Sequence, residues 1–457
     1  DTEAAVAAIW SQILQVEPVG VEDNFFDLGG HSLLANQIVS RLRKQFAVEL
    51  PIRDLILHPT VAQLAGRITN AHKSQALGEI EPLDRNQRIP LSAQQQRLWL
   101  LDQIDPGNPA YHVPSVVTIK GDLDPTLLEQ AFATVVNRHE GLRACFQEDE
   151  NGPRQIFLEP KGWPLEQLDV SGDEPAQLRR KAGSLVLKPF RLDQGPLFRA
   201  ALLSKGPREH ILLVVLHHIV TDGWSNGLLV RELGEAYLQL VANGQVAMSP
   251  LPLQYADYAA WQADWLHRTL DEKLAFWHQA LEQMPALELP LDHQRPRQQT
   301  FNGASVPLRL SAAAGAAMGD LANQYQATPF MILLAAYGAL LQRYSGQERF
   351  AVGTPVAGRD RPELEPIVGF FVNTVAIPLI PQPEQSFARL LEQIKATALD
   401  CFEHQDVPFE QIVEQLNPQR DMSRSPIFQV MLAYQNFPQE EAHIGAADLG
   451  NIRLEPY

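Results

Sequence analysis

Residues 211–223 read ILLVVLHHIVTDG, an apolar run that ends in two adjacent histidines. A continuous apolar run of this length indicates a strand that is buried on both faces, as in a sheet covered by helices. Residues 228–240 then have helical periodicity, and residues 113–119 and 123–138 repeat the pairing of a strand with a helix. This alternation predicts that most of the chain has an α/β fold.

The first 70 residues follow a different pattern. One face of the first predicted helix carries apolar residues at helical spacing, namely Val6, Ile9, Trp10 and Ile13. Three more short helical patterns follow before residue 70, and each has an apolar side. Four short helices with a shared apolar side predict a small all-α bundle.

The chain is too long for one compact core. At about 150 residues per domain, a chain of 457 residues is expected to form roughly three folded units. Residues 71–88 are polar and weakly patterned, so we assign them to a linker that follows the bundle at 1–70. We divide the remaining α/β region into two lobes, at 89–262 and 263–457.

Composition limits the class of function. The chain has 54 acidic and 37 basic residues, and its formal net charge of −17 argues against a nucleic-acid binder. Cys145 and Cys401 are the only cysteines, which excludes a disulfide framework and fits a cytoplasmic location. The apolar runs are too short to span a bilayer, so we expect no membrane partner.

A second motif lies between the first two predicted helices. Residues 23–34 read DNFFDLGGHSLL, in which Ser32 follows two glycines and a histidine. Taken alone, Ser32 fits a helix N-cap. The whole stretch resembles the phosphopantetheine attachment site of peptidyl carrier (thiolation) domains. The resemblance implies that residues 1–70 are a carrier domain with 4′-phosphopantetheine on Ser32, where the positive end of a helix favours a phosphodiester.

The adjacent histidines admit several explanations. Successive strand residues point to opposite faces, so only one of His217 and His218 can face a given cavity. Alternatively, both histidines pack in the protein core at the end of the strand. A metal site is a further alternative, with His218 and Asp222 as ligands, but a catalytic zinc needs three protein ligands and no third is evident nearby. We therefore expect no metal.

The His-His-x-x-x-Asp-Gly pattern at 217–223 closely resembles the signature of condensation domains of nonribosomal peptide synthetases, which are relatives of chloramphenicol acetyltransferase. Six further stretches agree with the family in order along the chain: 92–99 with 108–111, 138–146, 255–262, 367–374, 404–410 and 420–429. The resemblance implies a four-helix carrier bundle followed by an α/β condensation domain of two chloramphenicol-acetyltransferase-like lobes. It also implies amide bond formation by attack of an amine on a thioester.

The resemblance suggests a role for each residue of the motif. We expect His218 to take a proton from the attacking amine or to position that amine. The backbone amide of Gly223 is the candidate donor to the oxyanion. His217 is expected to pack on the far face of the strand. Asp222 is expected to be structural, because a buried carboxylate needs a partner, and Arg359 is the candidate partner.

Three other arginines belong to the matching stretches. We expect Arg97 either to line a tunnel and meet the phosphate of the arm or to be a surface arginine. Arg138 and Arg143 are expected to be structural, as members of ion pairs at a charged helix end. Trp224 and Ser225 follow Gly223, as in family members that accept L-configured donors.

The domain order implies the partners. A carrier domain directly before a condensation domain is expected to deliver the donor, so the acceptor thioester must come from another carrier domain. Other carrier and adenylation domains of the same synthetase and a phosphopantetheinyl transferase complete the expected partners. The resemblance also implies that the second lobe continues beyond residues 454–457.

Two other functions compete with condensation. An epimerase-like relative shares the histidine motif and moves an α-proton of a carrier-bound aminoacyl group, although the stretch at 92–99 favours condensation. A non-catalytic docking platform for a tailoring enzyme is the other competitor, and degraded histidines would be its mark. A heterocyclising relative is disfavoured, since it has aspartates in place of His217 and His218.

Overall fold

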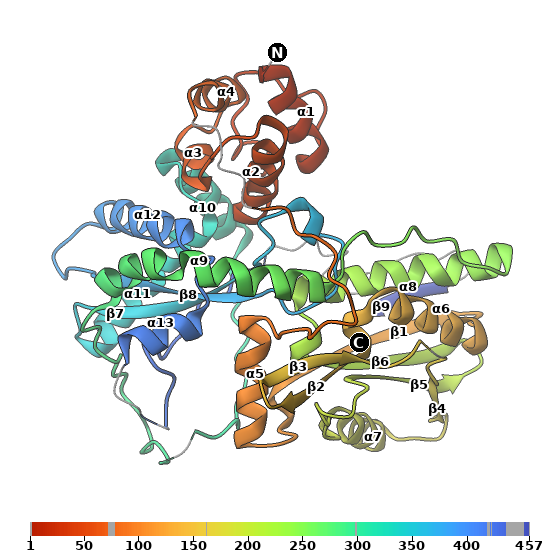
Figure 1. Cartoon of the computed structure of the whole chain (residues 1–457). Coiled ribbons are helices and arrows are strands. Elements are labelled where there is room, and N and C mark those ends of the chain that lie inside the picture. Colours follow the sequence, from red (N-terminus) through yellow and green to blue (C-terminus); the bar gives the residue numbers. More distant parts are fainter. Residues whose placement is uncertain are drawn as a thin grey trace. The chain divides into compact units, whose positions relative to one another are not determined.

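The computed structural model describes residues 2–71, 78–160, 162–297, 299–417, 421, 423–435 and 452–456 (Figure 1). The chain divides into two compact units. Unit 1 comprises residues 1–79, 268–362 and 373–436, and unit 2 comprises residues 80–267, 363–372 and 437–457.

Unit 1 begins with a helical bundle, drawn in red and orange in Figure 1. Its helices are α1 (Thr2–Leu14), α2 (Ser32–Phe46), α3 (Ile52–Leu57) and α4 (Val61–Asn70). Thr60 caps α4, since its hydroxyl accepts a hydrogen bond from the Gln63 amide at 3.3 Å. The apolar faces meet in one core that includes Trp10, Leu42 and Leu64. The predicted four-helix bundle is therefore confirmed.

Unit 1 also contains an α/β part. Strands β7 (Phe350–Val356) and β8 (Asn373–Leu379) pair antiparallel. The helices of this part are α10 (Ala312–Tyr325), α11 (Pro329–Ser345), α12 (Phe387–Glu403) and α13 (Phe409–Leu416). The long helix α9 (Tyr255–Leu281) contributes its second half to this unit and its first half to unit 2.

Unit 2 is built on a five-stranded sheet in the order β4-β5-β6-β1-β9. The strands are β1 (His112–Gly121), β4 (Glu166–Asp169), β5 (Phe198–Gly206), β6 (Glu209–His217) and β9 (Ile452–Pro456). Only β4 and β5 run parallel among the described pairs of this sheet. A hairpin of β2 (Ala144–Asp149) and β3 (Gly152–Phe157) stands beside it.

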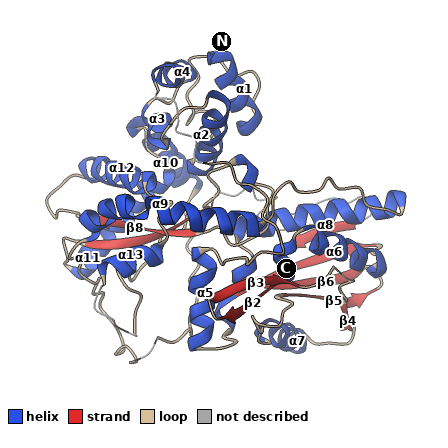
Figure 2. Cartoon of the chain, in the orientation of Figure 1, coloured by secondary structure: helices blue, strands red, loops and turns tan. Residues whose placement is uncertain are grey.

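Helices cover both faces of this sheet. In Figure 2, α6 (Pro125–Arg138) and α8 (Gly223–Asn243) lie on one side of the strands, and α7 (Pro175–Leu187) lies on the other. On β6, Leu212 and Leu216 join the core under α6 and α8. Leu213 and Val215 join the core on the opposite face, to which α5 (Ala93–Ile104) also contributes. The apolar run at 211–216 is thus buried on both faces, as its sequence predicts.

The two units are not continuous in sequence. The sequence division placed residues 263–457 in one lobe, whereas the structure groups residues 363–372 with unit 2. It also pairs β9 with β1, so that Ile452 lies opposite Gly121. Strand pairing and packing between such distant segments leave no local periodicity, which is why the pattern at 263–457 gave no sign of them.

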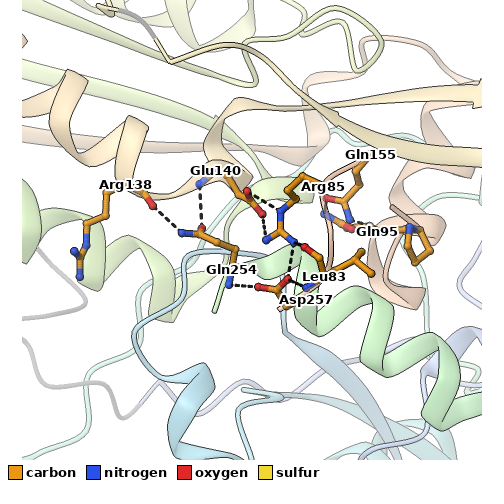
Figure 3. Close-up of polar contacts among 9 residues, drawn as sticks. Leu83, Arg85, Gln95, Arg138, Glu140, Gln155, Gln254 and Asp257 are labelled. Carbon is orange, nitrogen blue, oxygen red and sulfur yellow. Dashed lines mark hydrogen bonds and ion pairs between the residues drawn. The ribbon is translucent and has the colours of Figure 1, made fainter. Parts of the chain in front are cut away.

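Residues 80–88 pack on unit 2 through a polar network (Figure 3). The guanidinium of Arg85 contacts Glu140 and Asp257, each at 2.6 Å, and donates to the Leu83 carbonyl at 2.7 Å. The backbone N–H of Gln254 donates to the other carboxylate oxygen of Asp257 at 2.7 Å. The second half of the predicted linker is therefore bonded to α9 and to η2 (Glu140–Arg143). No described helix combines the length and apolar character needed to cross a membrane.

Candidate active site

The two histidines occupy different local structures at the end of β6. His217 is the last residue of the strand and is 3 % exposed. Its ring lies near the rings of His112 and Phe190, and its Nδ1 accepts a hydrogen bond from the Ile219 amide at 3.2 Å. Burial, with smaller effects of His112 and His218, lowers the pKa of His217 to about 3. His217 is therefore a neutral core residue near neutral pH.

His218 is the half-buried member of the pair. It begins the short 3₁₀ helix η3 (His218–Val220), and its ring lies 4.7 Å from the ring of Phe370. Its Nδ1 is 2.7 Å from the Thr221 carbonyl oxygen. Because a carbonyl can only accept, Nδ1 carries the proton of the neutral ring, and Nε2 is left as a proton acceptor.

Asp222 fixes the turn that follows the histidines. Its carboxylate is fully buried and caps α8, since Oδ1 accepts from the Ser225 amide at 2.8 Å. The other oxygen, Oδ2, accepts from the Phe371 amide at 3.0 Å. One carboxylate thus holds both the start of α8 and the segment 363–372. Gly223 is the first residue of α8, where backbone N–H groups have no acceptor within the helix.

Segment 363–372 packs closely on this turn. The Ser225 hydroxyl donates to the Gly369 carbonyl at 2.9 Å, and the Trp224 indole donates to the Glu365 carbonyl at 2.9 Å. The Tyr255 hydroxyl donates to the Phe370 carbonyl at 2.6 Å. A Cβ atom on Gly369 would lie 1.9 Å from the Tyr255 ring, so this approach requires glycine.

Residues 223–227 read GWSNG and match the G-x-S-x-G pattern of serine hydrolases, a match that sequence reasoning missed. The nucleophilic serine of that pattern must be accessible. Ser225 is instead fully buried, and its hydroxyl also accepts from the Gly369 amide at 3.1 Å. Ser225 is therefore a structural residue and not a nucleophile.

Two family models match the chain. A condensation domain model matches residues 85–455, and a phosphopantetheine attachment site model matches residues 4–68. The chain belongs to the condensation domain family. A phosphopantetheine carrier domain precedes the condensation domain, as the sequence predicts.

The curated relatives include large synthetases. One of the linear gramicidin synthase proteins of Brevibacillus parabrevis is 43% identical over 465 residues, which cover 100% of this chain and 6% of that protein. One of the plipastatin synthase proteins of Bacillus subtilis (strain 168) is 40% identical, over 97% of this chain and 12% of that protein. The chain thus spans only a small part of the length of these relatives.

Solved structures support the same fold. The X-domain from teicoplanin biosynthesis matches with a TM-score of 0.75 and 28% identity, over 83% of this chain and 84% of that chain. The first condensation domain of the CDA synthetase matches with a TM-score of 0.64, over 80% of this chain and 85% of that chain. At 22% identity, the second likeness shows the fold alone.

In the carrier domain, the loop before Ser32 is held tightly. A Cβ atom on Gly30 would lie 2.4 Å from the Phe25 carbonyl oxygen, and the Phe25 amide donates to the Pro59 carbonyl at 2.7 Å. Ser32 begins α2, and His31 caps it by accepting from the Leu34 amide at 3.5 Å. The first-turn N–H groups and the positive helix end fit a phosphodiester at this position. The side chain of Ser32 lies outside the described part of the chain.

The predicted arginines lie in different surroundings. Arg97 is half-buried on α5, and its charge acts on the nearby Tyr111. The Nε of Arg138 is 3.1 Å from Glu232, whereas Arg143 is buried and donates to the Leu158 carbonyl.

Arg359 is also buried, but it belongs to unit 1 while Asp222 belongs to unit 2. Pairing between Arg359 and Asp222 therefore stays a prediction. Sequence reasoning did not single out Glu232, a buried carboxylate on α8 that lies 2.8 Å from His139 Nε2. Its only signal was a charged residue on the apolar side of a predicted helix.

Proposed function

We propose that the condensation domain joins two carrier-bound aminoacyl groups by an amide bond. The amine nitrogen of the acceptor bonds to the carbonyl carbon of the donor thioester, and the carbon–sulfur bond of that thioester breaks. The proton that the amine loses ends on the released thiol. The observation that carries this proposal is the His218 ring, whose Nδ1 faces the Thr221 carbonyl at 2.7 Å so that Nε2 accepts a proton.

Neighbouring residues would support this step in different ways. We assign to the Gly223 amide, at the positive end of α8, the stabilisation of the negative oxygen of the tetrahedral intermediate. We assign to Asp222 the task of holding the loop, since both of its oxygens accept backbone N–H groups. The contact between the His218 and Phe370 rings limits the orientations of the imidazole.

The carrier domain would present the donor from Ser32. The 4′-phosphopantetheine bound there supplies the thiol that carries the donor as a thioester. A tethered donor has a high local concentration at the condensation domain, which replaces capture from solution. A phosphopantetheinyl transferase, adenylation domains and an acceptor carrier domain are the partners that this proposal requires. We also retain a cytoplasmic location, which is consistent with the burial of both Cys145 and Cys401 as thiols.

A docking platform is the second candidate. The X-domain of teicoplanin biosynthesis, solved in complex with OxyB, matches this chain with a TM-score of 0.75 and 27% identity. The fold is therefore compatible with a binding role. The ordered contacts of His218, Asp222 and Ser225 favour a catalytic role here.

An assay with two carriers tests the proposal. Ser32 is loaded in the full chain with a labelled aminoacyl group, a separate carrier is loaded with an acceptor amino acid, and both are analysed by mass spectrometry. We expect a dipeptidyl thioester on the acceptor carrier. A D-aminoacyl group on Ser32 would instead support epimerisation, and no change on either carrier would support docking.

Two variants sharpen this assay. His218→Ala should slow dipeptide formation by about 10²–10⁴-fold. His267→Ala is the matched control, because His267 is exposed on α9, and it should leave the rate unchanged. Ser32→Ala should abolish the mass increase that coenzyme A and a phosphopantetheinyl transferase produce. Near-full turnover by His218→Ala would refute the role of this histidine.

A further inference from the structure

Unit 2 contains an apolar cavity of about 90 Å³ between its sheet and the helices α6 and α8. The floor of the cavity is formed by alternate residues of β1 and β6, and its roof by the facing sides of the two helices. Its lining includes Val214 and Leu216 of β6 and Asn226, Leu229, Val230 and Tyr237 of α8.

The cavity leaves apolar side chains accessible deep inside unit 2. Val214 lies on β6 with strands on both sides, and Leu229 and Leu233 lie on the inner side of α8, yet all three are only partly buried. Protein interiors are normally close-packed, so an open space here forgoes contacts that larger side chains would make. With few polar groups in its walls, the cavity is poorly suited to ordered water.

One end of the cavity is connected to His218 through the hydrogen bonds of Asn226 and Thr221. Asn226 lines the cavity, and its side-chain oxygen accepts from the Thr221 hydroxyl at 2.8 Å. The Thr221 carbonyl in turn faces His218 Nδ1 at 2.7 Å. Leu216 also lines the cavity and directly precedes the two histidines, whereas Tyr237 lines it three turns further along α8. The cavity therefore extends away from the His218 turn along α8.

We propose that this cavity binds the apolar side chain of an aminoacyl group whose thioester is presented at His218. Apolar cavities on the order of 150 Å³ bind benzene, so a cavity of about 90 Å³ suits a smaller aliphatic group such as that of leucine or valine. The proposal rests on the proposed condensation function, since it names a specificity site for that reaction. The side chain comes from the donor or from the acceptor, and the experiment distinguishes the two sources.

Val230→Phe tests the proposal by filling the cavity from α8. Val241→Phe is the matched control, because Val241 lies on the same helix, is 57% exposed and does not line the cavity. Dipeptide formation is measured with leucyl or glycyl groups on Ser32 and, separately, on the acceptor carrier. With a leucyl group at one of the two positions, we expect Val230→Phe to slow dipeptide formation about tenfold or more. With a glycyl group at the same position, the rate should stay within about twofold of the wild-type rate.

The arms of the assay identify the source. A selective loss with leucyl on Ser32 assigns the cavity to the donor, and a selective loss with leucyl on the acceptor carrier assigns it to the acceptor. Equal effects on leucyl and glycyl substrates, or the same effects from Val241→Phe, would overturn the proposal. If Val230→Phe does not fold, Val230→Ile replaces it, with a smaller loss expected in the same direction.

A binding measurement separates this proposal from the function on which it rests. The thermal midpoint of the full chain is measured with leucyl and glycyl thioesters of N-acetylcysteamine. We expect the leucyl thioester to raise the midpoint of the wild type more than the glycyl thioester does, and this difference to vanish in Val230→Phe. A wild type that binds leucyl selectively but forms no dipeptide would refute the proposed function alone. If the two thioesters stabilise the wild type equally and Val230→Phe slows leucyl and glycyl turnover equally, the proposed role of the cavity is refuted while the proposed function stands.

Discussion

The Asp222 carboxylate accepts a hydrogen bond from the Phe371 amide at 3.0 Å, across 149 residues of sequence. This bond connects the turn after the two histidines with segment 363–372, which the chain enters from unit 1 and leaves to return to unit 1. Phe370, the neighbour of Phe371, contacts the His218 ring. The position of the candidate catalytic imidazole therefore depends on a carboxylate that never needs to touch the substrate.

Asp222→Ala should destabilise unit 2 while His218→Ala should not. Removal of the carboxylate leaves the Ser225 and Phe371 amides without this acceptor, which costs about 2–4 kcal/mol of unfolding free energy. Urea unfolding followed by tryptophan fluorescence measures the change. Asp222→Asn keeps one acceptor oxygen and should therefore lose less unfolding free energy than Asp222→Ala. Equal midpoints for wild type and Asp222→Ala would contradict the structural role of Asp222.

Local patterns in the sequence were enough to identify the elements that carry the site. The apolar run at 211–216 lies within β6, and the helical pattern at 228–240 lies within α8. The resemblance at 217–223 selected the candidate histidines. The contacts that orient them were not predictable, because Phe371 and Tyr255 approach the turn through the tertiary fold and not through any sequence period. Glu232 left only a charged residue on the apolar side of a helical pattern, and its partner His139 lies 93 residues away in sequence.

The stability of unit 2 should fall in acid because of His217. Burial, with smaller effects of His112 and His218, lowers the pKa of His217 to about 3, whereas an unfolded histidine titrates near 6.5. Between these values the unfolded chain binds the proton and the folded chain does not, so unfolding becomes more favourable as the pH falls. The effect is absent above about pH 6.5, and between pH 6.5 and pH 3 it lowers the unfolding free energy by about 1.4 kcal/mol per pH unit.

His217→Asn tests this contribution. Asparagine keeps an acceptor for the Ile219 amide but does not titrate. Urea unfolding between pH 4 and pH 7 should therefore show a shallower pH dependence in this variant than in the wild type. The control is His267→Asn, at an exposed position on α9, which should keep the wild-type slope. An unchanged slope in His217→Asn would assign the acid sensitivity to other groups.

Gly369→Ala should disturb the site through packing alone. The added Cβ would lie 1.9 Å from the Tyr255 ring, which must then move together with its hydrogen bond to the Phe370 carbonyl. Such overpacking costs about 1–3 kcal/mol of unfolding free energy, and dipeptide formation should fall with it. Gly183→Ala on α7 is the control, since its Cβ meets no atom within 4 Å. That variant should be about 0.5–1 kcal/mol more stable than the wild type, because alanine favours helix.

Arg85 should contribute more to the stability of unit 2 than a surface arginine does. Its guanidinium contacts Glu140 and Asp257, and the Asp257 carboxylate is 1% exposed (Figure 3). Removal of Arg85 leaves a buried carboxylate without its cation, whereas removal of both members of the pair leaves no such charge. Arg85→Met should therefore lower the unfolding free energy by about 3–5 kcal/mol.

A double-mutant cycle separates this effect from lost packing. Asp257→Asn keeps the shape of the side chain, and the double variant with Arg85→Met should recover part of the stability that Arg85→Met loses. Arg191→Met serves as the control, because both side chains of the Arg191–Asp193 pair are exposed and water screens their attraction, so its loss should change the unfolding free energy much less than the loss of Arg85. Strict additivity of Arg85→Met and Asp257→Asn in urea unfolding would show that the two side chains act independently, contrary to the 2.6 Å contact between them.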